Sequence, residues 1–234
     1  MNYSSLFEMM SKAAAGVGVI LGLSYVSGFF KSAMFYHELQ SGWILQLIDI
    51  QGHINKGLPL VVLDLMFMFL FFFFARYMRT FRFLPLFVVV VGVLGVALAW
   101  CIDPFDLQTS TEMRVAAFLT AGVAMVGSCT LAWLAHQRLE GVQPNFMFVT
   151  LGLAMAFCLA PGGTGYIAAD DLKHRQESAV EIIDEQNGVL GLLVSVVGDK
   201  YIMLDCNVMY QMRVVDMSVK VSLRQSSRRC GAIY

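Results

Sequence analysis

Two stretches of the chain decide its fold: FLPLFVVVVGVLGVALAWCI at residues 83–102 and VAAFLTAGVAMVGSCTLAWLA at residues 115–135. Neither stretch contains a charged side chain. A helix that crosses a membrane needs about 20 mostly apolar residues, each rising about 1.5 Å, and both stretches meet this length. The sequence therefore predicts an α-helical integral membrane protein.

The composition of the whole chain agrees with this prediction. Of its 234 residues, 58% are apolar and 14% are charged, against about 25% charged in a typical soluble domain. The chain has too few polar side chains to cover the surface of a soluble globular protein of this size. We therefore expect lipid to cover much of the protein. The formal net charge is -1, which excludes an overall basic surface for nucleic acid.

Three further apolar stretches raise the predicted number of spans to five. Proline is tolerated in the first turn of a helix and disfavours helix in the residue before it, so prolines are expected at span boundaries. Those predicted to open spans are Pro59, Pro85 and Pro144. The segment Pro161-Gly162-Gly163 is predicted to close the fifth span as a helix stop and hinge. The predicted spans are residues 13–30, 58–75, 84–102, 115–135 and 145–162.

Residues 31–57 join the first two spans and mix apolar with polar side chains. Their apolar positions fall near helical spacing, which is typical of an amphipathic helix lying in the membrane interface. A connecting loop with Trp43 as an anchor at headgroup level explains the same residues. The sequence leaves both interpretations open.

Charges in the short loops predict the orientation. Arg76, Arg79 and Arg82 cluster after the second predicted span, and short cytoplasmic loops carry an excess of Lys and Arg. We therefore expect a protein of the cell (inner) membrane with a cytoplasmic N-terminus. Five crossings then place the residues after Gly163 on the periplasmic or extracellular side, and one miscounted span would reverse that side.

Residues 166–234 are predicted to form a small unit outside the membrane, after a transmembrane domain of residues 1–165. The polar segment Asp170–Gln186 is compatible with a helix whose narrow apolar stripe contains Ile182 and Ile183. From Val189 the pattern becomes that of strands, which we predict at residues 189–197, 200–205, 208–215 and 219–223. In the last of these, apolar and polar side chains alternate, as in a half-buried strand. Three or four strands predict a small antiparallel sheet that depends on neighbouring structure for its stability.

Small residues recur every four positions in three of the predicted spans. Such a spacing leaves one helix face bare, so that a neighbouring backbone can approach closely. The predicted packing residues are Ala14, Gly18 and Gly22; Ala116, Thr120, Ala124, Ser128 and Ala132; and Gly152, Ala156 and Ala160. These stripes fit either packing within the chain or docking on another membrane protein.

Asp64 is the ionisable residue that lies well inside a predicted span. Burying a carboxylate in lipid costs about 2.5 kcal/mol or more, so Asp64 needs a partner or water. Cations near the outer face that are predicted within its reach are Lys56, Arg114 and Lys31. Asp64 is either an ion or proton site in a transport path or a structural link that orients the second span.

The segment that contains Asp170, His174 and Glu177 places three possible zinc ligands on one face of a helix. Lys173 and Arg175 lie between them and no second histidine lies nearby. A solvated, charged helix is therefore favoured over a metal site. We expect no metal and no cofactor.

The five cysteines form two groups and match no CxxC or Cys/His ligand spacing. Cys101, Cys129 and Cys158 lie in or beside apolar stretches and are expected to act as small buried apolar residues. Cys206 and Cys230 lie in the polar part of the chain. A disulfide between these two requires an oxidising compartment.

These observations favour a membrane protein that is not an enzyme and acts through protein contacts. We expect its partners to be membrane lipid and either a second membrane protein or a second copy. Two versions fit: an accessory subunit of an inner-membrane complex, or an immunity-type antagonist of a membrane-acting toxin. The alternative is a small oligomeric transporter or channel that uses Asp64.

Overall fold

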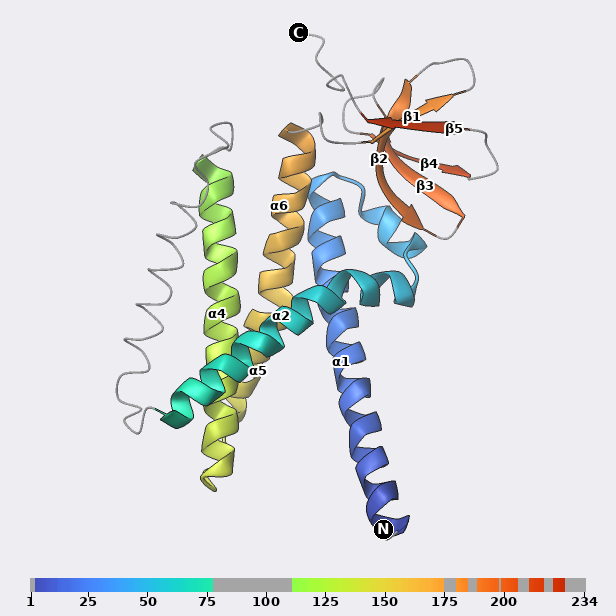
Figure 1. Cartoon of the computed structure of the whole chain (residues 1–234). Helices are drawn as coiled ribbons and strands as arrows, with labels where there is room; N and C mark the ends of the chain where they lie inside the picture. Colours follow the sequence, from blue (N-terminus) through green and yellow to red (C-terminus); the bar gives the residue numbers. More distant parts are fainter. Residues whose placement is uncertain are drawn as a thin grey trace. The chain divides into compact units, whose positions relative to one another are not determined.

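The computed structural model describes residues 3–77, 111–174, 180–184, 189–197, 199–205, 211–216 and 221–225 (Figure 1). The helices are α1 (Tyr3–Glu38), the 3-10 helix η1 (Gly42–Leu47), α2 (Ile50–Tyr77), α4 (Thr111–Leu139), α5 (Phe146–Ala154), the π-helical segment η3 (Met155–Leu159) and α6 (Ala160–His174). The strands are β1 (Val180–Asp184), β2 (Val189–Val197), β3 (Lys200–Asp205), β4 (Met212–Asp216) and β5 (Val221–Gln225). The predicted span at residues 84–102 lies outside the described residues.

The chain divides into two compact units. The first, here called the helical unit, comprises Met1–Lys31 and His53–Thr164. The second, called the sheet unit, comprises Ser32–Gly52 and Gly165–Tyr234. Residues 32–52, which lie between the first two predicted spans, therefore belong to the same unit as the strands, although they lie far from them in the sequence.

Four helical stretches among the described residues are long and apolar enough to cross a membrane. They are Ser11–Glu38, Ile50–Phe73, Val115–Leu139 and Phe146–Lys173. Each overlaps a predicted span and extends beyond it at one end or at both. The prediction of long apolar helices is thus confirmed for these four, and the predicted count of five spans stays a prediction.

The prediction that Pro59 opens the second span is wrong, because α2 begins at Ile50 and contains Pro59 in its interior. The Asp49 carboxylate accepts a hydrogen bond of 2.7 Å from the Gly52 backbone N–H, which satisfies a donor that a helix N-terminus leaves unpaired. Pro59 lies on an exposed part of the helix. Residues 31–57 are accordingly neither one amphipathic helix nor a plain loop: they contain the end of α1, η1 and the start of α2.

The prediction that Pro161-Gly162-Gly163 ends the fifth span is also wrong, because the helix continues through these residues to His174. Proline lacks the N–H that an α-helix uses to bond the carbonyl four residues earlier, here that of Phe157. The π-helical segment η3 comes directly before Pro161 and widens the helix there. The Ser27 hydroxyl donates a hydrogen bond of 3.3 Å to the Phe157 carbonyl. Wider turns and side-chain donors of this kind let membrane helices tolerate proline.

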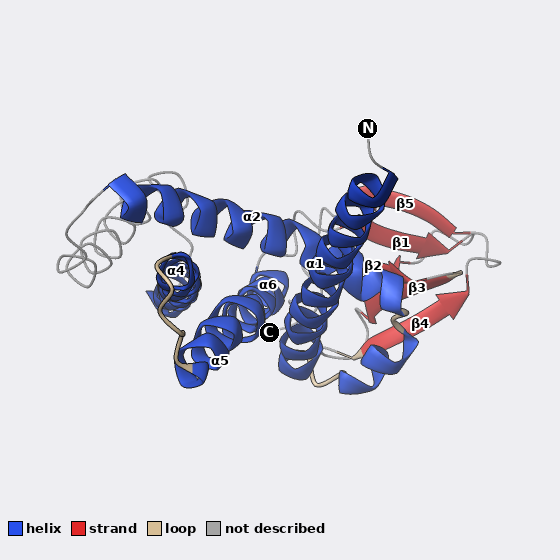
Figure 2. Ribbon diagram, turned by 90° about the horizontal axis from the view of Figure 1, so that it is seen from below, coloured by secondary structure: helices blue, strands red, loops and turns tan. Residues whose placement is uncertain are grey.

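The five strands form one antiparallel sheet in the order β4-β3-β2-β1-β5, which Figure 2 shows strand by strand. The predicted antiparallel sheet is therefore confirmed, with one strand more than the sequence indicated. The helix predicted to continue to Gln186 is wrong, because Val180–Asp184 is a strand. It pairs with β2 on one side and β5 on the other, and Ile182 faces Gly191 and Leu223 in the two registers. This pairing on both sides overrides a weak helical pattern.

The core of the sheet unit joins the sheet to the helical segments of the same unit. Its sheet side contains Leu192, Ile202, Leu204 and Met212, and its helical side contains Tyr36, Leu39, Ile44, Ile48 and Ala169. A side-chain hydrogen bond also joins Tyr36 and Ser195. Burying each large apolar side chain stabilises the fold by about 1.5–3 kcal/mol. The sheet thus gains its stability from the residues between α1 and α2 and from α6.

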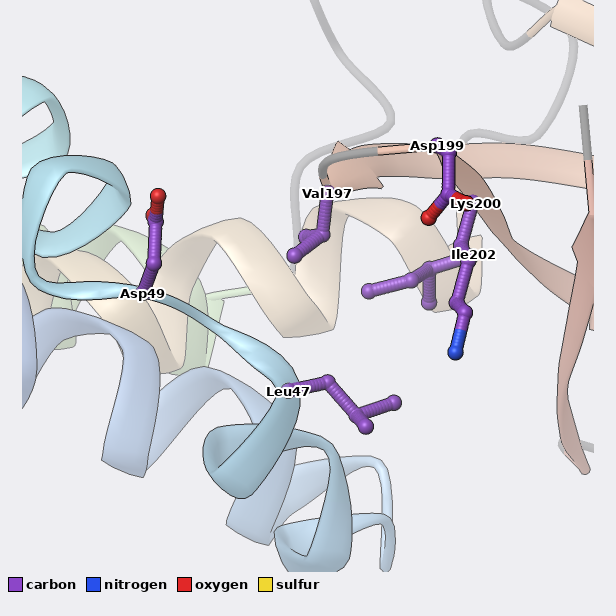
Figure 3. A pocket seen from close by; sticks show the side chains of 6 residues that line it. All are labelled: Leu47, Asp49, Val197, Asp199, Lys200 and Ile202. Carbon is purple, nitrogen blue, oxygen red and sulfur yellow. The ribbon is translucent and has the colours of Figure 1, made fainter.

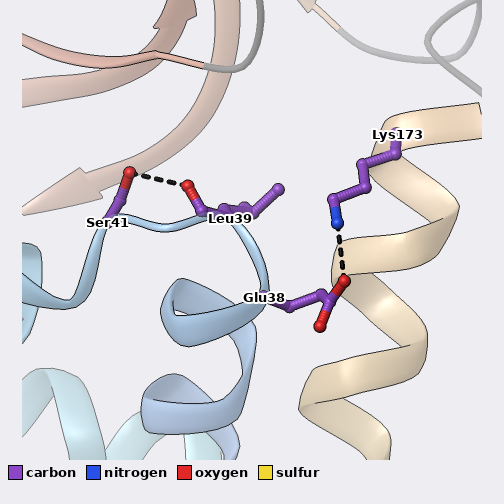
Figure 4. A network of polar contacts seen from close by, with 4 residues as sticks. All are labelled: Glu38, Leu39, Ser41 and Lys173. Atoms are coloured by element: carbon purple, nitrogen blue, oxygen red, sulfur yellow. Dashed lines mark hydrogen bonds and ion pairs between the residues drawn. The ribbon is translucent and has the colours of Figure 1, made fainter.

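Polar contacts at the helix ends support this core (Figure 4). The Lys173 ammonium donates a hydrogen bond of 2.6 Å to the Glu38 carboxylate, which joins the end of α6 to the end of α1. The Ser41 hydroxyl donates to the Leu39 carbonyl at 2.9 Å and shapes the turn after α1. Both partners of the ion pair are partly exposed, so the pair contributes about 1 kcal/mol or less.

In the helical unit, α1 and α2 cross where both carry glycine. A Cβ atom added at Gly57 would lie 2.5 Å from the Gly28 nitrogen and would collide with the Ser24 carbonyl oxygen. A Cβ atom at Gly28 would collide with the His53 carbonyl oxygen. The two backbones therefore touch, and only glycine allows this approach.

This crossing predicts the effect of Gly57→Ala. We expect the substitution to lower the free energy of unfolding by about 1–3 kcal/mol, the usual cost of overpacking. The control is Gly22→Ala, because a Cβ atom there meets nothing within 4 Å. The measurement is unfolding of the purified protein in detergent micelles. Equal stability of the two variants would show that α1 and α2 do not cross at these glycines.

Candidate functional site

Among the described residues of the helical unit, five polar side chains are buried, all on stretches able to span a membrane. They are Ser24, Ser27, His53, Asp64 and Ser128. Hydrocarbon offers no hydrogen bonds, so buried polar groups in a membrane are costly and usually serve structure or function. These residues are the candidates for a functional site.

Asp64 is the most demanding of them. It lies on α2 and is 6% exposed. The Ser128 hydroxyl of α4 donates a hydrogen bond of 3.4 Å to its Oδ1 atom. Among the described side chains the Asp64 carboxylate forms no ion pair, so the predicted pairing with a cation near the outer face is not what the structure shows. The side chain of Arg114 lies outside the description.

An apolar cluster contains residues that neighbour Asp64 and Ser128 along their helices. Its buried members are Val61, Ala156 and Phe157, packed against Leu23, Leu65 and Leu131. Val61 and Leu65 flank Asp64 on α2, and Leu131 lies one helical turn after Ser128 on α4. The cluster joins α1, α2, α4 and η3, and we call it, with Asp64, Ser128 and Ser27, the membrane hub.

The helices of the hub approach through small residues. A Cβ atom at Gly127 of α4 would lie 2.7 Å from the backbone nitrogen of Ala156 in η3. A Cβ atom at Gly152 would lie 3.1 Å from the Leu131 side chain. Since Gly127 precedes Ser128 directly, this close contact holds the Ser128 hydroxyl at its position beside α2.

Two further buried polar side chains, Ser24 and His53, lie on α1 and α2. The Ser24 hydroxyl donates to the Ile20 carbonyl of its own helix at 2.8 Å, a local bond that serine commonly makes within helices. The His53 ring lies 5.6 Å from the ring centroids of both Tyr25 and Phe29. His53 is thus part of an aromatic contact between α1 and α2.

The chemistry of the hub is that of a polar contact between helices. Neither Asp64 nor Ser128 is joined to a histidine among the described residues, so the pair lacks the linked nucleophile and base of covalent catalysis. A carboxylate buried in a span can bind a proton or a cation. It can equally fix the rotation of α2 against α4.

The predicted small-residue stripes have different surroundings. Two of them lie at helix contacts within the chain: Ser128, Ala132, Gly152, Ala156 and Ala160 are buried, and Ala116, Thr120 and Ala124 are half-buried. A Cβ atom at Gly163 would collide with Thr120. The first stripe differs, because Ala14, Gly18 and Gly22 are exposed and no described residue covers them.

The three weak candidates for metal ligands, Asp170, His174 and Glu177, are not tested together, because two of their side chains lie outside the description. Asp170 lies on α6, the side chain of His174 is not described, and Glu177 lies outside the described residues. No group of three His, Cys, Asp or Glu side chains able to hold a metal ion occurs among the described residues. Cys129 and Cys158 are free thiols, and the predicted pair Cys206–Cys230 also lies outside the description.

Sequence reasoning did not find Ser27, Gly28, Gly57 and Gly127. Ser24 and Gly28 are four residues apart, as are His53 and Gly57, so a search for small residues at this spacing on a second face of α1 would have suggested the crossing. Ser27 carries no such signal. Its role depends on Phe157 and Pro161, which are far from it in the sequence.

A double-mutant cycle tests the pair of Asp64 and Ser128. We expect Ser128→Ala to lower the free energy of unfolding in detergent by about 1 kcal/mol, since it removes the donor. Asp64→Asn keeps an acceptor oxygen and removes the charge. The expected coupling of the cycle Asp64→Leu with Ser128→Ala is about 0.6 kcal/mol, the mean for hydrogen bonds between membrane helices. Strictly additive effects of the two substitutions would contradict the contact.

Comparison of the chain with protein-family models, with curated proteins and with solved structures found no match. What the protein does is therefore inferred from its own geometry. Three features bear on it: the membrane hub at Asp64, the exposed small-residue face of α1 and the sheet unit.

Proposed function

We propose that this chain is a non-enzymatic, multi-pass protein of the cell (inner) membrane that acts through protein contacts. The observation that carries the proposal is a face of α1 that none of the described residues covers. Residues 11–22 are exposed throughout. Within them Ala14, Gly18 and Gly22 form a face on which added Cβ atoms at Gly18 and Gly22 would meet nothing within 4 Å.

Small-residue faces at two other places in the chain are packed against a neighbouring helix. At Gly57 and at Gly127, glycine lets the backbone of another helix make direct contact. Helices associate in lipid through close packing at small residues, because lipid tails already satisfy apolar side chains. A bare face in residues 11–22 therefore supports binding of a membrane helix from a second protein or a second copy.

The sheet unit supports the same proposal. In the part of the sheet that the structure describes, the outer strands β4 and β5 each pair with one strand. An edge strand presents unpaired backbone groups to which an extended segment of a partner can add. An accessory subunit of a membrane complex and an immunity-type antagonist of a membrane-acting toxin both require a membrane face and an exposed unit of this kind.

The test is purification from native membranes in a mild detergent, with mass spectrometry of the associated proteins. We expect a stoichiometric partner, or a second copy, that is lost in the variant Gly18→Leu/Gly22→Leu. The matched control is Val19→Leu, which changes an exposed neighbour (61% exposed) without filling the small-residue face. A chain that purifies as a monomer, or a partner retained by the double variant, would contradict the proposal.

A transporter or channel is the second candidate, and the burial of Asp64 favours it. This candidate predicts that the reconstituted homo-oligomer conducts protons or cations across vesicles and that Asp64→Asn lowers the flux at least tenfold. Ser128→Ala serves as the control that removes the partner and keeps the carboxylate. Equal flux in empty vesicles and in vesicles with the protein would exclude this candidate.

A further inference from the structure

A hollow of about 190 Å³ lies inside the sheet unit, between the end of η1 and the hairpin formed by β2 and β3 (Figure 3). It is lined by Leu47, Asp49, Val197, Asp199, Lys200 and Ile202. None of these residues has a role in the membrane hub or in the proposed contacts of α1. We call this hollow the hairpin pocket.

The hairpin pocket has an apolar wall and a charged rim. The side chains of Leu47, Val197 and Ile202 converge on it in Figure 3. Its charged side chains are those of Asp49, Asp199 and Lys200. Among the described residues, Asp199 and Lys200 form no ion pair, and Asp49 keeps a second carboxylate oxygen besides the one bonded to Gly52.

The position of the pocket along the chain sets its surroundings in a membrane. Residues 39–49 join two stretches able to span it, Ser11–Glu38 and Ile50–Phe73. This short connection keeps Leu47 and Asp49 close to the membrane surface. Trp43 and Ile50 are 49% and 68% exposed, and tryptophan is enriched at headgroup level.

The size and charge of the pocket limit its ligand. Sites for drug-sized molecules usually have about 300–1,000 Å³, so this hollow suits a smaller group. Lys200 and Asp199 are adjacent in the sequence and both line the pocket, and this cation and carboxylate complement a group that carries both a phosphate and an ammonium. The apolar wall suits a ligand whose polar end continues into hydrocarbon.

We propose that the hairpin pocket binds the headgroup of a phospholipid with a primary amine, the phosphatidylethanolamine class. Lys200 binds the phosphate, Asp199 accepts a hydrogen bond from the ammonium, and Leu47 and Val197 contact the first carbons of the lipid. The proposal rests on the proposed membrane location and is independent of the contacts of α1. A bound lipid would link η1 to the hairpin and stabilise the sheet unit.

The test measures thermal unfolding of the full-length protein in detergent during titration with short-chain lipids. We expect dihexanoyl phosphatidylethanolamine to raise the melting temperature in a saturable way. Phosphatidylcholine has no ammonium hydrogens to donate, and phosphatidylglycerol has no cation in its headgroup. Both lipids are therefore expected to raise the melting temperature at least threefold less. Free phosphoethanolamine in excess is expected to compete with the amine lipid.

Variants locate the effect in the pocket. Lys200→Gln and Asp199→Asn keep side-chain length or shape and are each expected to weaken the response to the amine lipid at least threefold. The matched control is Lys12→Gln, an exposed lysine of α1, which is expected to respond as the original chain. Equal shifts with all three lipids, no competition by phosphoethanolamine, or an unchanged response in Lys200→Gln would each overturn the proposal.

A separate measurement distinguishes this failure from a failure of the proposed function. After an alkaline wash of membranes, an integral membrane protein stays with the lipid. If the protein stays with the membranes but shows no preference for the amine lipid, the hairpin pocket is not a lipid site and the membrane location stands. If the wash releases the protein, both the membrane location and the lipid site are contradicted.

Discussion

Hydrocarbon neither donates nor accepts hydrogen bonds, and the helical unit is arranged around this constraint. Each polar group that its helices bury needs a partner from the same chain. Ser128 supplies one for Asp64, and Ser27 supplies one for the Phe157 carbonyl, whose usual donor is missing at Pro161. Both contacts join different helices, so meeting the constraint also fixes how α1, α2, α4 and η3 pack. The π-helical segment η3 belongs to the same solution, because it lets one helix carry a proline in its interior.

Small residues provide the rest of the packing in this unit. Where Gly57 meets α1 and Gly127 meets η3, the backbones themselves are in contact, and many weak dispersion contacts replace the hydrophobic effect that lipid removes. The uncovered face at Gly18 and Gly22 has the same composition. The internal faces are covered by another helix of the chain, whereas no described residue covers the face at Gly18 and Gly22. Because the residues of these faces are alike, we propose that a partner helix binds the face at Gly18 and Gly22.

The sheet unit follows the rules of water-soluble domains instead. Its core takes Leu192 and Ile202 from the strands, Tyr36 from the end of α1, and Ile44 from η1. The helical segments contribute side chains to the same core as the strands, so they are part of the fold of this unit. The same arrangement brings Leu47 and Asp49 next to Val197 and Lys200 and creates the hairpin pocket.

The sequence by itself determined the long apolar helices, because length and the absence of charge are local properties that lipid selects directly. It also determined strands β2 and β3 to the residue, since their apolar runs end at turns. It misplaced the start of α2 and the end of the last helix, because Pro59 and Pro161 are tolerated through contacts or exposure that a local pattern does not contain. It took Val180–Asp184 for helix, because only pairing with β2 and β5 makes this segment a strand. The sequence marked Asp64 as a residue in need of a partner, and only the tertiary structure decided that the partner is Ser128, because that choice depends on which helix faces which across the membrane hub.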